Sequence, residues 1–404
     1  MKKQIVSLTL IFLVIYSYSQ QWTFLGFPDE QINAIAVHPQ NPNIIFVSGN
    51  NLYKSSDGGI NWDTVSFYSF NSIIFQPTNP DTIYATFGMG SFSDGIYKSS
   101  DGGNNWNILE WMNCVTSLTI PTSPQGILVA GTKGFGVYQS TDYGNTWALI
   151  NDSLDNLNVL SLKCINFVDC DSGLTYIVGT KGGIFYYSQF LEPYWHNTNT
   201  ATNASVPAIS SSNNVGYPLW AAIDGGSWSD GMYKSTDFGG TWTVSEYWPF
   251  ITDILVNPNP NTVYAADSSY GVKRTINGGA SWETINSGLG DSVVYCLAQS
   301  RSDTTHLYAG TSSGVYVIDF SIGILEISNE NNIAVYPNPT NDKIEIESPK
   351  KTNIEIINAR GQIIEKLKTS NIKTKVDLTK YSSGVYIIKA KTDNGIIVKK
   401  IIKK

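Results

Sequence analysis

The sequence predicts an all-β chain, with a seven-bladed β-propeller over residues 20–320 followed by a small β-sandwich over residues 331–404. Two observations predict the propeller. A short motif of the pattern S/T-x-D-x-G-x-N/T-W recurs along the chain, and the tryptophans that end it lie 40 to 48 residues apart. Four short strand patterns fill each repeat, which is typical of one propeller blade. A sharp change in charge after residue 330 predicts the second domain.

Residues 1–19 have the composition of a secretory signal peptide. Two lysines precede an apolar run over residues 5–16, and Ser17 and Ser19 supply the small residues that precede a cleavage site. The run is too short to span a bilayer, and no other stretch approaches that length. We therefore expect an exported chain without a transmembrane segment.

The repeated motif is predicted to form a tight hairpin turn between the third and fourth strands of each repeat. Its Asp accepts backbone N–H groups of the same turn, its Gly takes a positive φ, and its Trp buries a large ring against a neighbour. The structural pairs are Asp57 and Trp62, Asp101 and Trp106, Asp142 and Trp147, Asp237 and Trp242, and Asn277 and Trp282. A sixth copy keeps only the spacing from Ser188 to Trp195.

The seventh repeat ends near Ile318 without a motif or a fourth strand. The segment Gln21–Leu25 resembles the strands that follow the motif in the other repeats. We expect this N-terminal segment to pair with the last repeat and close the ring, because closure hides an exposed sheet edge.

Residues 321–330 are predicted to be a linker, after which the composition changes. The last 74 residues carry 15 basic and 7 acidic side chains, a net charge of +8, whereas residues 20–330 carry −17. Alternating patterns over 343–347, 353–357 and 385–388 predict the strands of a small sandwich. The acidic charge of the propeller argues against nucleic acid as a partner.

Both domains resemble known families. The repeated motif resembles the BNR/Asp-box of sialidase-superfamily, sortilin-like, photosystem II assembly-factor-like and xyloglucanase-like propellers, families of unrelated function. YPNPT at 336–340, NARG at 358–361, SGVY at 383–386 and the basic tail at 399–404 resemble the type A C-terminal sorting domain of the type IX secretion system of Bacteroidota. That resemblance implies the type IX machinery as a partner, and delivery through the periplasm to the outer-membrane surface or the medium.

Several catalytic signatures fail when their residues are examined. A sialidase needs three arginines around the substrate carboxylate, and the propeller has only Arg274 and Arg301. The segment 310–314 matches the G-x-S-x-G pattern of a nucleophile elbow, but parallel turns at 131–134 and 179–182 hold the same place in other repeats. We interpret it as a strand-connecting loop.

No cofactor is expected. Asp169 and Asp171 are weak calcium candidates, since a third oxygen ligand and a bidentate Glu are missing. Cys164 and Cys170 lie close enough in sequence for a hairpin disulfide, which stays open. Cys114 and Cys296 are predicted to be buried thiols.

The predicted function is a non-catalytic binding module for a glycan or a protein. Aromatic residues and carboxylates gather in loops on the face away from the Asp-boxes, a combination that suits sugar rings. The predicted ligand-binding residues are Trp111, Trp228, Trp248, Phe92, Tyr68, Asp94 and Asp230. The alternatives are rings that only cap the blade cores, a surface assembly scaffold, and a glycoside hydrolase of the xyloglucanase type. Acids for the hydrolase would come from Asp94, Asp230, Glu110 and Glu246, although no spacing singles out a pair.

Overall fold

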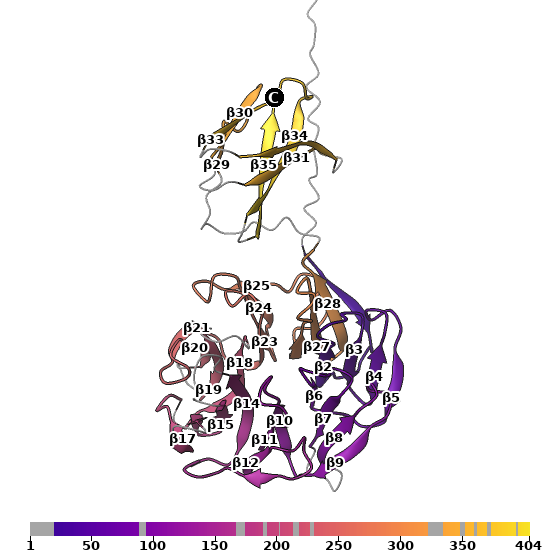
Figure 1. Ribbon diagram of the computed structural model, residues 1–404, viewed down its shortest axis with the longest axis vertical. Helices are drawn as coiled ribbons and strands as arrows, with labels where there is room; N and C mark the ends of the chain where they lie inside the picture. The colour runs from indigo at the N-terminus through magenta and orange to yellow at the C-terminus, as the bar shows by residue number, and fades with distance from the viewer. Residues whose placement is uncertain are drawn as a thin grey trace, which may run out of the picture. The chain divides into compact units, whose positions relative to one another are not determined.

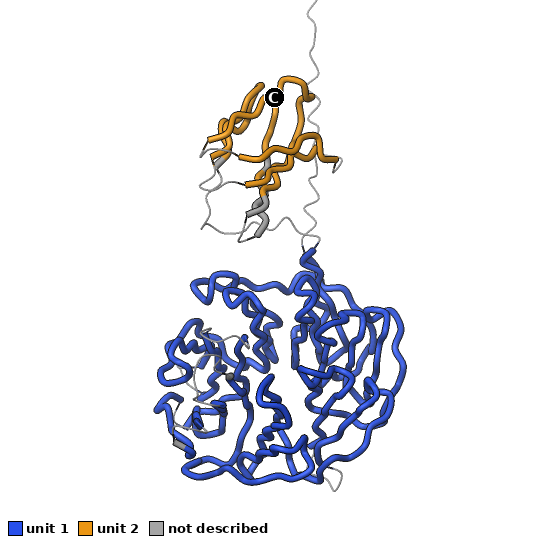
Figure 2. Tube along the Cα trace, in the orientation of Figure 1, with its two compact units in different colours: residues 1–321 blue, residues 322–404 orange. Residues whose placement is uncertain are grey.

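The structure is a computed structural model that describes residues 20–88, 94–166, 174–188, 192–201, 203–212, 218–226, 230–321, 334–347, 352–358, 362–369, 373–392 and 395–404. The chain divides into two compact units, Met1–Ser321 and Ile322–Lys404 (Figure 2). The described residues form β-strands and no helix, which confirms the all-β prediction. The predicted signal peptide and residues 322–330 of the predicted linker lie outside the described residues.

In the described residues, the first unit forms seven four-stranded antiparallel sheets arranged around a central axis (Figure 1), and we call each sheet a blade. Blade 1 holds β2 (Ala34–Val37), β3 (Ile45–Ser48), β4 (Leu52–Ser55) and β5 (Asp63–Ser66), and blade 2 holds β6 (Ser72–Phe75), β7 (Ile83–Phe87), β8 (Gly95–Ser99) and β9 (Asn107–Trp111). Blade 3 holds β10 (Val115–Thr119), β11 (Leu128–Thr132), β12 (Gly136–Ser140) and β13 (Ala148–Leu149), and blade 4 holds β14 (Val159–Asn166), β15 (Leu174–Thr180), β16 (Gly183–Ser188) and β17 (Glu192–Asn197).

The remaining blades follow the same plan. Blade 5 holds β18 (Ser205–Ser211), β19 (Leu219–Asp224), β20 (Gly231–Ser235) and β21 (Thr243–Tyr247), and blade 6 holds β22 (Ile251–Val256), β23 (Val263–Asp267), β24 (Gly271–Thr275) and β25 (Glu283–Thr284). Blade 7 combines β26 (Val294–Ala298), β27 (His306–Thr311) and β28 (Gly314–Asp319) with β1 (Trp22–Gly26).

The N-terminal strand β1 closes the ring by pairing antiparallel with β28. Trp22 lies opposite Ile318 in this ladder, and Phe24 lies opposite Tyr316. The buried Trp22 ring also donates a hydrogen bond of 2.5 Å from Nε1 to the carbonyl of Ile285. These contacts confirm the predicted ring closure, which removes the open edge that β28 would otherwise present.

The hydrophobic cores lie between adjacent blades. One core joins Ile35 and Val47 of blade 1 to Tyr308 and Val315 of blade 7. Second strands such as β15 are buried along their whole length, because a neighbouring blade covers each of their faces. Such strands are therefore near-continuous runs of Val, Ile, Ala and aromatic residues, whereas outer strands such as β5 and β21 are exposed or half-buried.

The second unit packs two sheets around its own core. A three-stranded sheet has the order β29 (Ala334–Tyr336), β30 (Lys343–Glu347) and β33 (Lys373–Asp377), and a four-stranded sheet has the order β32 (Ile363–Lys368), β31 (Asn353–Asn358), β34 (Gly384–Thr392) and β35 (Gly395–Lys403). Ile344 and Ile346 of β30 face Ile354 and Ile356 of β31 in the buried cluster. The two-residue spacing in each strand is the alternation that a sandwich requires.

Candidate functional site

The first strand of every blade lines a central cavity of about 480 Å³. Each of these seven strands contributes an aliphatic residue to the wall: Ile35, Ile73, Leu118, Leu162, Ile209, Leu255 and Leu297. The wall also includes Pro39, Pro77 and Pro121, which belong to the turns between first and second strands.

The cavity lies toward the same end of the propeller as the Asp-boxes. In a four-stranded antiparallel blade, the turn from strand one to two and the turn from three to four lie at one end, and the other connections lie at the opposite end. The Pro-rich turns are of the first kind and the Asp-boxes of the second. The cavity therefore lies at the end away from the loops in which the aromatic ligand face is predicted.

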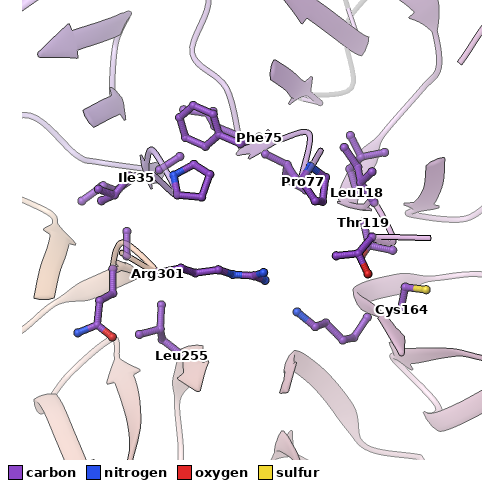
Figure 3. A pocket seen from close by; sticks show the side chains of 18 of the residues that line it. Ile35, Phe75, Pro77, Leu118, Thr119, Cys164, Leu255 and Arg301 are labelled. Atoms are coloured by element: carbon purple, nitrogen blue, oxygen red, sulfur yellow. The ribbon is translucent and has the colours of Figure 1, made fainter. Parts of the chain in front are cut away.

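Two cations belong to this cavity. Lys163 comes from β14, and Arg301 follows β26 at the end of the central cavity, which we also call the channel. The Arg301 side chain extends into the cavity, toward the side where Thr119 and Cys164 lie (Figure 3). Lys163 and Arg301 also line an adjoining space of about 250 Å³ together with residues 210–212. No Asp or Glu is among the described residues that line either space.

Lys163 is half-buried, whereas Arg301 is exposed although it lines the same cavity. Desolvation, and secondarily the positive charge of Arg301, lowers the pKa of Lys163 to about 8. Desolvation also lowers the pKa of Arg301. Within the described part of the chain, neither cation forms an ion pair or a hydrogen bond with another side chain. A cation that is removed from water without a counter-charge is costly unless a ligand supplies one.

Two hydroxyl groups beside the cations are also unpartnered. Ser211 and Ser212 are each 8% exposed, and neither Oγ has a hydrogen-bond partner among the described residues. Both residues line the space next to Lys163 and Arg301. Gln299 lies at the same place, but its amide donates to the Thr304 carbonyl at 2.9 Å and its oxygen accepts from the Asn257 side chain at 2.7 Å.

From the sequence, Arg301 was identified only as one of two arginines in the propeller, and Lys163 was not predicted as a site residue. A signal for Lys163 was nevertheless present. Lys163 lies opposite Ile177 in the pairing of the first and second strands of blade 4. The equivalent residues are Thr119, opposite Val129 in blade 3, and Ala298, opposite Tyr308 in blade 7. The other equivalent residues are Ala36, Ile74, Ser210 and Leu255. In the described first strands, Lys163 is the charged exception at this position.

The predicted aromatic residues divide between exposed and buried positions. Trp111, at the end of β9, is 61% exposed, and Tyr68 is 41% exposed with its ring against Tyr97 and Phe87. Trp248 is only 4% exposed and packs in the core between blades 5 and 6. Trp248 is therefore a core residue and not an exposed ring of the predicted loop face. Phe92 and Trp228 lie outside the described residues, so their assignment stays a prediction.

The two predicted carboxylates accept hydrogen bonds from backbone N–H groups. Asp94 is 2% exposed and accepts a hydrogen bond from the Cys114 N–H at 3.1 Å. Asp230 accepts a hydrogen bond from the Gly225 N–H at 2.7 Å. These contacts position the loops between second and third strands. They leave a role of either carboxylate in ligand binding as a prediction.

Other exposed aromatics extend the face that Trp111 and Tyr68 share. The described residues of this kind at the end away from the Asp-boxes are Phe67, Phe135, Tyr247, Phe250 and Tyr270. Each lies at the end of a fourth strand, between two blades, or between second and third strands. We call these five residues with Tyr68 and Trp111 the aromatic rim.

The Asp-boxes form one repeated hydrogen-bonded turn. In the first copy, Asp57 Oδ1 accepts the Asn61 N–H at 2.9 Å and Oδ2 accepts the Asn61 side-chain amide at 2.7 Å. The buried Ser55 Oγ accepts the Gly59 N–H at 2.8 Å and donates to Asp57 Oδ1 at 2.9 Å. Equivalent bonds occur around Asp101, Asp142, Asp237 and Asn277. The Asn105 side chain and backbone lower the pKa of Asp101 to about 2.

The box tryptophans secure the turns to the blade edges. The indole N–H groups of Trp106, Trp147 and Trp242 donate to carbonyls of Gly103, Gly144 and Gly239 in their own turns. The corresponding atom of Trp282 donates to Ser245 Oγ of the adjacent blade at 3.2 Å. The indole nitrogen of Trp62 is buried without a described partner. The Trp195 ring, from the degenerate copy, is 2% exposed.

The remaining candidate sites are structural or lie outside the described residues. Ser312 of the G-x-S-x-G segment lies in the tight turn between β27 and β28, and its hydroxyl donates to Asp291. Among the described residues, no group of three His, Cys, Asp or Glu side chains could hold a metal. The calcium candidates Asp169 and Asp171 and the cysteine at 170 lie outside them. Cys164 and Cys296 are buried and Cys114 is half-buried, so the burial predicted for Cys296 is confirmed.

Comparisons with known proteins identify the C-terminal region. Residues 334–404 match the family model of the secretion system C-terminal sorting domain. No curated protein matches the chain. The described residues contain no helix with the length and apolar character that crossing a membrane demands.

Several solved structures share the fold of the chain. YCF48 from Cyanidioschyzon merolae is 16% identical with a TM-score of 0.53, over 74% of this chain and 99% of that one. A GH74 enzyme from Niastella koreensis is 15% identical with a TM-score of 0.59, over 95% of this chain and 74% of that one. The extracellular domain of the putative hybrid two-component system BT3049 from B. thetaiotaomicron is 14% identical with a TM-score of 0.59, over 95% and 60%.

Identities this low establish a shared fold and leave function open. The sorting domain carries the information about location, because it directs export by the type IX system to the cell surface or beyond. The chain is therefore a β-propeller protein that carries a type IX secretion sorting domain at residues 334–404.

Proposed function

We propose that the exported propeller is a non-catalytic binding module whose aromatic rim holds a glycan or protein ligand. The observation that carries the proposal is how three of the four candidate acids are used. Asp94 and Asp230 hold backbone N–H groups, and Glu246 pairs with Lys273 at 3.0 Å. The described cavities of the propeller are lined by no carboxylate. Glycoside hydrolysis requires two carboxyl groups that flank one bond.

The aromatic rim supports binding on the open face. Seven large rings at one end of the propeller expose apolar surface to water, and such clustered surface marks interaction sites. Tyr and Trp rings can stack on the C–H faces of sugars or bury protein side chains. Solved neighbours include both a xyloglucanase and a YCF48 with a bound D1 peptide, so this fold accommodates either ligand class.

The test is a binding screen that measures chemistry at the same time. The purified chain is titrated with xyloglucan, arabinoxylan and polygalacturonate, and released reducing ends are measured in each sample. Retention on a polysaccharide without release supports the proposal, and Trp111→Ala should weaken that retention while Ile60→Ala should not. Ile60 is a suitable control because it is 80% exposed in the first Asp-box, at the other end of the propeller. Catalytic release of reducing ends would overturn the non-catalytic assignment.

A further inference from the structure

We infer that the Asp-box end of the channel binds the carboxylate of an apolar ligand, with Lys163 and Arg301 as its two cationic partners. The inference deepens the proposed function, because it assigns a ligand class to the propeller. It concerns a different surface, however, at the end away from the aromatic rim. Binding at the two surfaces can therefore be measured, and can fail, separately.

The first argument is charge. Residues 20–330 carry 26 acidic and only 9 basic side chains. A half-buried cation such as Lys163, in so acidic a chain, should readily find a carboxylate, yet none lines the space around Lys163 and Arg301 in the described residues. The two like charges instead face a common cavity, where each disfavours the other. An anion between them would offset both the repulsion and the lost hydration.

The second argument is geometry. A guanidinium offers a planar fork of N–H donors that matches a carboxylate bidentately, and an ammonium adds a compact second charge. The Arg301 fork already points into the cavity (Figure 3). The Ser211 and Ser212 hydroxyls, buried and unpartnered beside both cations, supply further donors for the same oxygen atoms.

The third argument is the character of the wall. Beyond the cations, most of the lining residues are Ile, Leu, Ala and Pro with one Phe ring, and Thr119, Thr122, Cys164 and Gln299 add polar groups. A hydrocarbon body of several carbons fits about 480 Å³ and would gain about fourfold in affinity for each methylene removed from water. A sugar acid would leave hydroxyl groups against aliphatic side chains without partners, which is unfavourable. An inorganic phosphate would gain nothing from the wall.

The experiment uses a series of anions at constant ionic strength. The purified chain is titrated with acetate, butyrate, hexanoate, phosphate and galacturonate, with chloride as the reference ion, by calorimetry and thermal unfolding. The expected result is saturable binding with a rise in Tm that grows from acetate to hexanoate. Galacturonate and phosphate should bind at least about tenfold more weakly than hexanoate, because neither buries a hydrocarbon chain.

Variants assign the binding to the channel. Lys163→Met and Arg301→Met should each weaken hexanoate about 10- to 100-fold, since each removes a charge-assisted contact. Lys181→Met is the matched control, because Lys181 is exposed in the turn between β15 and β16 of the same blade. Trp111→Ala should leave hexanoate affinity unchanged, which separates this site from the aromatic rim.

Thermal unfolding in chloride shows that the variants fold, and it tests whether loss of an unpaired charge raises Tm. Removing the half-buried, unpaired charge of Lys163 should raise Tm in chloride for Lys163→Met, and at the same time abolish the rise that hexanoate causes. The inference is overturned if no carboxylate binds the wild-type chain, or if the variants bind as tightly as wild type. Equal affinity for phosphate or galacturonate and hexanoate would overturn the assigned ligand class.

Discussion

Replacing Trp248 with Ala should destabilise the propeller strongly and leave the ligand affinity of the folded fraction unchanged. The ring packs in the core between blades 5 and 6, with Trp220, Met232 and Ile251 in the same cluster. The Lys273 ammonium lies 4.6 Å from the centre of the ring. The indole nitrogen has no described hydrogen-bond partner, so its removal breaks no hydrogen bond.

These contacts determine how far Trp248→Ala should lower the free energy of unfolding. Truncating a buried Trp to Ala costs about 3–5 kcal/mol, and loss of the cation–π contact adds about 0.5–1 kcal/mol. Removing a buried donor without a partner returns part of that cost, on the order of 1 kcal/mol. The free energy of unfolding should therefore fall by about 2.5–5 kcal/mol. Trp111→Ala should change it by no more than about 0.5 kcal/mol, because that ring is 61% exposed.

Urea denaturation of the two variants and of Tyr247→Ala measures the difference. Tyr247 precedes Trp248 and is 68% exposed, so it serves as the adjacent surface control. Ligand retention is then compared under conditions in which each variant is fully folded. A loss below 1 kcal/mol for Trp248→Ala, combined with lost ligand retention, would refute the reasoning and return this ring to the ligand face.

Four other predictions follow from the contacts described above. Asp57→Ala should lower the free energy of unfolding by about 1–3 kcal/mol without a specific effect on ligand, because donors of the box lose their acceptor. Burial raises the pKa of Asp253 from 3.8 to about 6, so this group should make the protein less stable by up to about 3 kcal/mol as pH rises from 4 to 6. A chain that begins at Pro28 lacks β1 and should aggregate or melt at a lower temperature. Deletion of residues 331–404 should leave a folded propeller that is retained in the periplasm.

The controls for these predictions differ in kind. The box prediction fails if Asp57→Ala unfolds normally yet no longer binds ligand. The pH effect is measured by urea unfolding between pH 4 and pH 7. The fall in stability with rising pH that Asp253 causes should disappear in Asp253→Asn. It should persist in Asp63→Asn, because the Asp63 side chain is exposed on β5. Unchanged thermal unfolding of the truncated chain would contradict closure by β1. Normal extracellular levels of the deleted chain, measured by immunoblot of the medium and cell fractions, would reject the sorting role.

The sign of the Asp253 effect follows from which form of the carboxyl the fold disfavours. The carboxylate accepts the N–H groups of Ile254 and Leu297, each at 2.8 Å, but those bonds do not offset its lost hydration. The folded chain therefore binds a proton more tightly than the unfolded chain does. Stability from this group is greatest below the unfolded pKa and is lost as pH rises through the folded value.

The fold could be predicted because its signal is repeated. Each copy of the box marks the same turn, and the lone strand at Trp22 fits the gap that the last repeat leaves. The assignment of Trp248 failed at a finer level. In blade 2, Gly95 pairs with Trp111, and in blade 5 Gly231 pairs with Tyr247. The true counterpart of Trp248 is Met112, one residue beyond the exposed ring.

A shift of one residue along a strand exchanges the two faces of the sheet. Glu110-Trp111-Met112 and Glu246-Tyr247-Trp248 are therefore aligned triplets in which the second residue is exposed and the third is buried. Matching tryptophan to tryptophan across blades misses this pattern, whereas matching by distance from the box shows it. The limit in this case was the alignment of the repeats, since the residues themselves were sufficient.

The channel site depends on information of another kind. Aligned repeats reveal Lys163 as the charged residue at a position that is otherwise apolar or small, but they do not name its neighbour. Arg301 lies in a connecting turn, where repeats differ in length and alignment gives no register. Only closure of the ring brings blade 4 and blade 7 to one cavity. Both cations then lack a protein counter-charge in the described residues. We therefore expect the anion that pairs with them to come from outside the chain.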